Sequence, residues 1–182
     1  VTVFRLVAEM DGGPICAQER FPVPPGATSG EMLESLAKRG SQMLVDVLQS
    51  RQLGVCAEYA QNSLHATYAP KILPGEALID WETTALALEH RVRALNPAPG
   101  AYALLENGRR LKIWKAFSQE GHGAPGSVVG EKNGFPLGAC ASGALALEEV
   151  QAEGRSRTDG AAWWRGQPGG EQAVVFRRPA CR

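Results

Sequence analysis

Residues 101–117, AYALLENGRRLKIWKAF, decide the fold of the second half of the chain. Asn107-Gly108 stands between two apolar stretches, and this dipeptide is the strongest short-range signal of a β-hairpin. Further strands are predicted in SVVGE, PLGACA and ALALEEV, which glycine-rich turns separate, and in AVVFRR near the end. A short helix capped by Asp159 is predicted between ALALEEV and AVVFRR. Five or six short strands in this span favour a small β-barrel.

The first quarter of the chain predicts two strands followed by a helix. VTVFRLV and ICAQERFPV are extended in pattern, and MDGGP between them is a turn. Thr28 and Glu31 stand three residues apart before apolar positions, so a capping box is expected to begin a helix near Thr28. Gly40 interrupts the apolar spacing, which predicts two helical stretches with a kink or break between them.

A connector and a second helix follow. Residues 53–79 have little periodicity, and a domain boundary is expected within them. Asp80 can cap a helix whose apolar stripe is Ala85, Leu88, Val92 and Leu95. The prolines at 97 and 99 end that helix.

Composition places the chain among ordinary globular proteins. Its 182 residues hold 19 basic and 19 acidic side chains and are 44% hydrophobic, so no global field attracts a polyanion and any nucleic-acid role needs a local patch. The four cysteines form no C-x-x-C pair, which predicts a reduced, cytoplasmic protein without structural zinc. No apolar run long enough for a membrane span is visible. The chain opens on Val1 within a predicted strand, so it is expected to begin inside a larger protein.

Few residues suggest chemistry by themselves. Asp11-Gly12-Gly13 is either an ordinary turn or a carboxylate held at a strand end, where it could accept a proton, and the pattern alone leaves both readings open. The histidines have no ligand spacing, and no phosphate-binding loop or nucleophile elbow occurs.

The order of motifs resembles one family along nearly the whole chain. ATYAPKILPGEALIDW (66–81), RVRALNPAPGAY (91–102), LKIWKA (111–116), PGSVV (125–129) and ACASGALALEEVQAEG (139–154) are similar to methionyl-tRNA formyltransferases, as is VTVFRLVAEMDGGPI (1–15). The resemblance implies an α/β plus β protein. Residues 1–66 would be the tail of a Rossmann-like formyltransferase domain, 67–81 a linker and 82–182 an OB-like barrel domain that binds tRNA.

The resemblance also implies an activity. The full enzyme would transfer a formyl group from 10-formyltetrahydrofolate to the amine of initiator methionyl-tRNA, without a metal, as a cytoplasmic bacterial monomer; an organellar origin stays open. Asp11 matches the catalytic carboxylate of the family's D-x-G turn. The family's catalytic asparagine and histidine have no match in these residues, so this polypeptide alone is expected to be inactive.

For tRNA, the resemblance indicates Lys71, Arg93, Lys112, Lys115 and Arg155. Arg93 near a helix end and Asn96 before a proline are equally explained by structure, through the helix dipole and a cap. Lys112 and Lys115 are three apart, so only one of them can face tRNA from a regular strand.

Three alternatives remain. A sugar-nucleotide formyltransferase or a formyl-folate hydrolase would also have a carboxylate like that of Asp11. The motifs Y-A-P-K-I and L-K-I-W-K-A, however, are associated with the methionyl-tRNA formyltransferases and not with these two enzymes. A noncatalytic tRNA-binding module would use the barrel face alone. Salt-dependent affinity for tRNA in the absence of the missing half would identify such a module.

Overall fold

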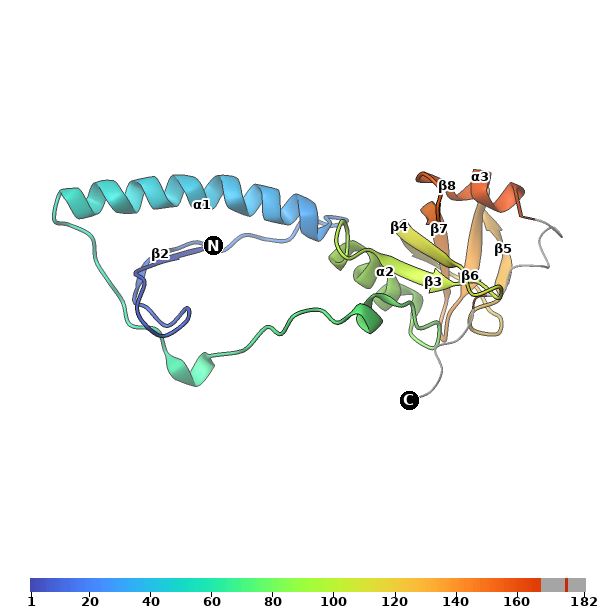
Figure 1. Cartoon of the computed structure of the whole chain (residues 1–182), viewed down its shortest axis with the longest axis horizontal. Helices are drawn as coiled ribbons and strands as arrows, with labels where there is room; N and C mark the ends of the chain where they lie inside the picture. The colour runs from blue at the N-terminus through green and yellow to red at the C-terminus, as the bar shows by residue number, and fades with distance from the viewer. Residues whose placement is uncertain (168–175, 177–182) are drawn as a thin grey trace. The chain divides into compact units, whose positions relative to one another are not determined.

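The computed structural model describes residues 1–167 and residue 176, and it divides into two compact units, Val1–Lys71 and Ile72–Arg182. Figure 1 shows the order of the elements along the chain. No helix among the described residues is both long enough and apolar enough to cross a membrane.

The first unit holds a short hairpin and one long helix. Strands β1 (Thr2–Phe4) and β2 (Ile15–Gln18) pair antiparallel, and α1 spans Ser29–Gln52. The capping box at Thr28 is confirmed, because the Thr28 hydroxyl accepts from the amide of Glu31 while the Glu31 carboxylate accepts from the amide of Thr28 at 2.8 Å. This reciprocal pair satisfies two of the free amides at the helix start.

The predicted break at Gly40 is wrong, because α1 is one helix throughout. A Cβ at this position would lie 3.2 Å from the Val1 side chain. The glycine therefore lets the side chain of Val1 approach the helix closely, at the cost of a poor helix propensity.

The connector after α1 is extended except for two 3-10 turns, η1 (Ser63–His65) and η2 (Pro74–Ala77). Tyr59 exchanges both backbone hydrogen bonds with Ile15, at 2.8 and 2.9 Å. This bridge holds the start of the connector beside β2.

The first α-helix of the second unit is α2 (Ala85–Ala94), which buries the predicted stripe of Ala85, Leu88 and Val92. Its N-cap is Thr84, whose hydroxyl accepts from the amide of Ala87, so the prediction of Asp80 as the cap is wrong. The carboxylate of Asp80 accepts from the amide of Glu82 instead, in the turn before the helix.

Within the described residues, six antiparallel strands form the sheet of this unit. They are β3 (Ala101–Leu104), β4 (Arg110–Gln119), β5 (Val128–Lys132), β6 (Phe135–Ala139), β7 (Ala144–Ala152) and β8 (Thr158–Asp159). The order is β3-β4-β7-β6-β5, with β8 beside β7, so the hairpin predicted at Asn107-Gly108 is confirmed. Asp159 caps α3 (Gly160–Arg165), also as predicted.

An OB-like barrel is not confirmed, because β3 and β5 end the sheet and no pairing between described strands closes it. Phe176 forms a bridge with Leu105 after β3 and donates its amide to the carbonyl of Gly126 before β5 at 2.8 Å. One residue therefore contacts the chain near both edges. The rest of the predicted strand AVVFRR lies outside the described residues.

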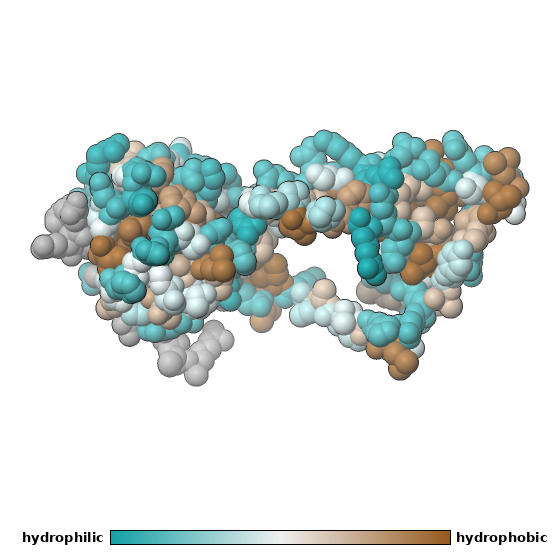
Figure 2. Space-filling model, turned by 180° about the vertical axis from the view of Figure 1, so that it is seen from behind, coloured by the Kyte–Doolittle hydropathy of each residue, from teal (hydrophilic) through white to brown (hydrophobic). Residues whose placement is uncertain are grey.

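The main core belongs to the second unit. Trp81 and Phe176 stack in its centre with ring centroids 4.7 Å apart, and α2 packs over β4 and β7. In the first unit only Met43 and Val47 are buried apolar residues within the described chain. Figure 2 shows apolar residues at the molecular surface. In the first unit, Leu6 and Met10 are more than four-fifths exposed. The first unit therefore has much less internal packing than the second.

Candidate functional site

The turn that carries Asp11 lies between β1 and β2 and has an unusual backbone. Asp11 adopts φ 55°, a left-handed conformation that aspartate tolerates better than most residues. A Cβ on Gly13 would lie 1.7 Å from the carbonyl oxygen of Arg5, so only glycine fits there. The local backbone therefore explains why an aspartate and a glycine are suited to the two fixed positions of the D-x-G pattern.

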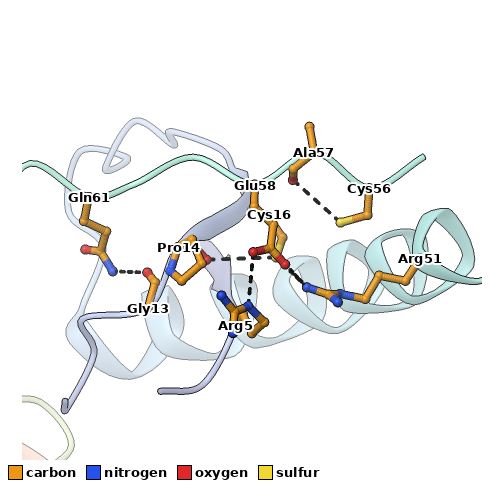
Figure 3. Close-up of polar contacts among 9 residues, drawn as sticks. All are labelled: Arg5, Gly13, Pro14, Cys16, Arg51, Cys56, Ala57, Glu58 and Gln61. Carbon is orange, nitrogen blue, oxygen red and sulfur yellow. Dashed lines mark hydrogen bonds and ion pairs between the residues drawn. The ribbon is translucent and has the colours of Figure 1, made fainter. Parts of the chain in front are cut away.

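Gln61 holds this turn from the connector. Its side-chain amide donates to the carbonyl oxygens of Asp11 and Gly13, at 2.6 Å in each case, and Figure 3 shows the bond to Gly13. The bridge between Tyr59 and Ile15 brings Gln61 to this place. The carboxylate of Asp11 is exposed and makes no hydrogen bond or ion pair with any described residue. The backbone of the turn is thus fixed while its acidic group is available.

A charged cluster lies beside the turn and joins three elements of the first unit. The carboxylate of Glu58 accepts from Arg5 Nε at 3.1 Å and pairs with Arg51 at the end of α1 (Figure 3). Hydrogen bonding to Arg5, with the charges of both arginines, lowers the pKa of Glu58 despite some desolvation. Sequence reasoning did not find this cluster or Gln61, because Glu58 and Gln61 lie in the connector and their contacts with Arg5 and Asp11 span 53 and 50 residues.

In the second unit a β-bulge at Trp114 determines where the lysines of β4 lie. The register against β7 shifts between Ile113 and Lys115, so Trp114 is an extra residue. Leu111, Ile113 and Ala116 remain buried.

Lys112 and Lys115 consequently share the outer side of the strand, where Lys112 is half-buried and Lys115 exposed. The expectation that only one of them can face a ligand was based on a regular strand and is wrong for this geometry.

Basic side chains enclose the Trp114 ring on this outer side. The Arg157 guanidinium lies 3.6 Å and the Lys112 ammonium 5.1 Å from its centroid, both within cation–π range. The indole nitrogen donates to Gln151 Oε1 at 3.1 Å, which fixes the ring. Lys112, Trp114 and Arg157 are called the Trp114 cluster below.

Lys115 and Lys112 differ in how far a nearby carboxylate compensates their charge. Its ammonium lies 2.6 Å from a carboxylate oxygen of Glu148, and this hydrogen bond, with the Coulombic attraction, raises the pKa of Lys115. Lys112 donates only to the carbonyl of Pro99, at 3.4 Å, and has no carboxylate partner among the described residues. Of the two lysines, Lys112 therefore has the less compensated charge.

The other predicted tRNA residues are not members of this cluster. Lys71 is exposed at the end of the first unit, and Arg155 is exposed after β7. Arg93 on α2 lies 3.9 Å from Glu89, one turn earlier, in agreement with a structural role. Asn96 does not cap α2, since Leu95 is the C-cap and the Asn96 amide donates to the carbonyl of Trp114 at 2.8 Å.

Within residues 1–167 and 176, no group of three or more His, Cys, Asp or Glu side chains is arranged to hold a metal ion.

Residues 71–168, just over half of the chain, match the family described as formyl transferase, C-terminal domain. The chain therefore belongs to this formyltransferase family.

More specifically, it is 35% identical over 182 residues to a methionyl-tRNA formyltransferase of Chlamydia pneumoniae, which covers 96% of this chain and 57% of the relative. A methionyl-tRNA formyltransferase of Symbiobacterium thermophilum is 38% identical over 155 residues, covering 82% of this chain and 47% of that protein. The chain thus spans about half the length of the curated relatives it matches.

Solved structures agree with the fold. A crystal structure of HypX from Aquifex aeolicus matches with a TM-score of 0.70 at 19% identity, over 94% of this chain and 32% of that one. A HypX structure in complex with tetrahydrofolic acid also gives 0.70 at 19% identity, over 98% and 33%.

Proposed function

We propose that this chain is the C-terminal part of an enzyme that formylates the amino group of initiator methionyl-tRNA. The observation that carries the proposal is the 35–38% identity with methionyl-tRNA formyltransferases over most of the chain. The donor is 10-formyltetrahydrofolate, and the tetrahydrofolic acid complex of a protein with the same fold supports a folate carrier. The complete protein acts in the cytoplasm as a monomer.

Asp11 is the catalytic group that this chain contributes. The reaction requires a neutral attacking amine and protonation of the folate nitrogen as it leaves, and a carboxylate can take part in such proton transfers. The fixed turn and the exposed carboxylate of Asp11 support this role. The asparagine and histidine of the family's catalytic set have no counterpart in residues 1–182, so the chain by itself has no formylation activity.

The second unit binds the tRNA. Lys112 of the Trp114 cluster supplies positive charge on one side of β4, where Arg157 is itself paired with Glu149, and Lys71 and Arg155 add charge elsewhere on the chain. Phosphate contacts of this kind make affinity fall as salt concentration rises. Arg93 and Lys115 contribute less, since each is paired with a glutamate.

The test uses the complete enzyme that this proposal implies, in which the rest of the catalytic domain precedes Val1. We expect this protein to formylate initiator methionyl-tRNA, and Asp11→Asn to lower kcat by about 10² or more, as loss of a general acid–base does. Asp46→Asn on the exposed side of α1 is the matched control and should keep full activity. Near-normal formylation by Asp11→Asn would refute the role of Asp11, and formylation of a different amine substrate would refute the proposed acceptor.

A further inference from the structure

A cavity of about 530 Å³ opens in the second unit between the end of the β3–β4 hairpin, the turn after β7 and helix α3. It lies apart from the Trp114 cluster, since none of that cluster's residues lines it. Its size falls within the range of pockets that hold small organic ligands.

Three arginines line this cavity. Arg109 and Arg110 come from the hairpin and Arg155 from the turn after β7, and no aspartate or glutamate is among the described lining residues. None of the three guanidinium groups forms an ion pair within the described chain, whereas Arg157 and Lys115 of the same unit are paired. The charged residues that line the cavity are therefore all of one sign, and no acidic residue among the described lining residues compensates them.

The arginines differ in how firmly they are held. Arg109 donates to the carbonyl of Glu153 at 2.9 Å, and Arg110 lies 4.9 Å from the centroid of the Tyr102 ring. The side chain of Arg155 makes no contact of either kind with the described residues. The carboxylate of Glu153, which is outside the lining set, accepts from the backbone amide of Arg110 at 3.2 Å. Two guanidinium groups are thus preorganised and one can adjust to a ligand.

The remaining lining combines apolar and neutral polar groups. Leu105, Ala152, Ala162 and Trp163 supply apolar surface, and Ser156 and Thr158 supply hydroxyl groups. Arginine forks match the oxygens of a phosphate in pairs, and apolar walls suit a nucleobase. A phosphate alone would leave most of this volume unfilled.

We propose that this cavity binds a nucleotide, with its phosphate on Arg109, Arg110 and Arg155 and its base against the apolar wall near Trp163. The nucleotide is either free or part of an RNA strand. Only the second source rests on the proposed tRNA partner, so the cavity is testable without formyl transfer.

The experiment is a titration of the 182-residue chain with adenosine monophosphate, adenosine or inorganic phosphate. Calorimetry and tryptophan fluorescence measure the binding of each ligand. We expect the monophosphate to bind at least tenfold more tightly than adenosine or phosphate. Arg155→Ala should weaken its binding about tenfold. Arg91→Ala, which removes an exposed arginine of α2 outside the cavity, is the matched control and should have no effect.

A short oligoribonucleotide then distinguishes the two sources. Tighter binding of the strand than of the monophosphate, lost in Arg155→Ala, identifies RNA as the source, and equal binding identifies a free nucleotide. Failure of both ligands to bind, or equal loss in Arg91→Ala and Arg155→Ala, would overturn the proposal. Formylation by the longer protein is measured separately, so neither result decides the other.

Discussion

The side-chain amide of Gln61 lies 2.6 Å from the carbonyl oxygen of Asp11, fifty residues earlier in the chain, and equally close to that of Gly13. One side chain therefore ties both ends of the D-x-G turn to the connector. Its action on Asp11 passes through the backbone, which makes it a positioning residue.

Gln61→Glu should loosen this turn more than Gln61→Ala. The glutamate has the same shape, but a carboxylate oxygen would replace the amide nitrogen that donates to the two carbonyl oxygens. This oxygen cannot donate and would repel them. We expect faster amide hydrogen exchange in residues 9–13 of both variants of the chain, with the larger change in Gln61→Glu. Gln42→Ala, whose partner is Asp46 on the outside of α1, is the control. Unchanged exchange in both Gln61 variants would remove the positioning role.

In tRNA binding, Lys112→Ala should have a larger effect than Lys115→Ala. Lys115 is already neutralised by Glu148, whereas Lys112 keeps its charge on the same side of β4. For Lys112→Ala we expect weaker binding and a salt dependence reduced by about one phosphate contact. Filter binding at several salt concentrations measures both. A larger loss in Lys115→Ala would contradict the charge argument.

Glu89 should contribute to stability in a pH-dependent way. Burial opposes its ionisation, but hydrogen bonds from the amide and hydroxyl of Ser118, each 2.7 Å, leave its pKa below the ordinary value. Because the folded pKa is lowered, the stabilisation is present above the unfolded value of about 4.3 and is lost as the pH falls through the folded one.

Glu89→Gln should therefore lower the free energy of unfolding by about 1–2 kcal/mol at pH 7, with a smaller difference near pH 4. Urea unfolding at the two pH values measures this. Glu34→Gln, in an exposed pair with Lys38 on α1, should cost no more than about 0.5 kcal/mol. A pH-independent loss for Glu89→Gln would argue for a packing defect and against the charged hydrogen bonds.

Cys140 should be unreactive in the folded chain. Its side chain is 5% exposed, and burial raises the pKa of the thiol to about 11, so almost no thiolate forms at pH 8. Cys16 is only partly buried and should be alkylated much faster by iodoacetamide. Peptide mapping by mass spectrometry measures both rates, and unfolding in urea should make them equal. Rapid alkylation of Cys140 in the native chain would contradict the buried site.

Local sequence signals predicted the local structure well. The Asn107-Gly108 hairpin and the caps at Thr28 and Asp159 depend on contacts between residues at most a few positions apart, and all three are confirmed. The choice of Asp80 over Thr84 as the second cap was wrong because both residue types accept from amides, and only the course of the turn distinguishes them.

Long-range relationships could not be predicted in this way. The bulge at Trp114 is defined by the register of β4 against β7, which no period-two pattern contains. The role of Gly40 depends on Val1, and the contact of Gln61 depends on the connector returning to β2. For the same reason, Gln61 and Arg157 could be recognised only from the structure, whereas Asp11 and Lys112 were indicated by the resemblance and stay predictions.

Phe176 also bears on where the second unit ends. The family match stops at residue 168, eight positions before this ring, yet Phe176 is 1% exposed and stacks on the fully buried Trp81. A protein shortened to the matched segment would expose one face of that indole to water and lose the residue that contacts both Leu105 and Gly126. We therefore expect the second unit to need Phe176 in order to fold by itself, so that its folding domain is longer than the segment that matches the family.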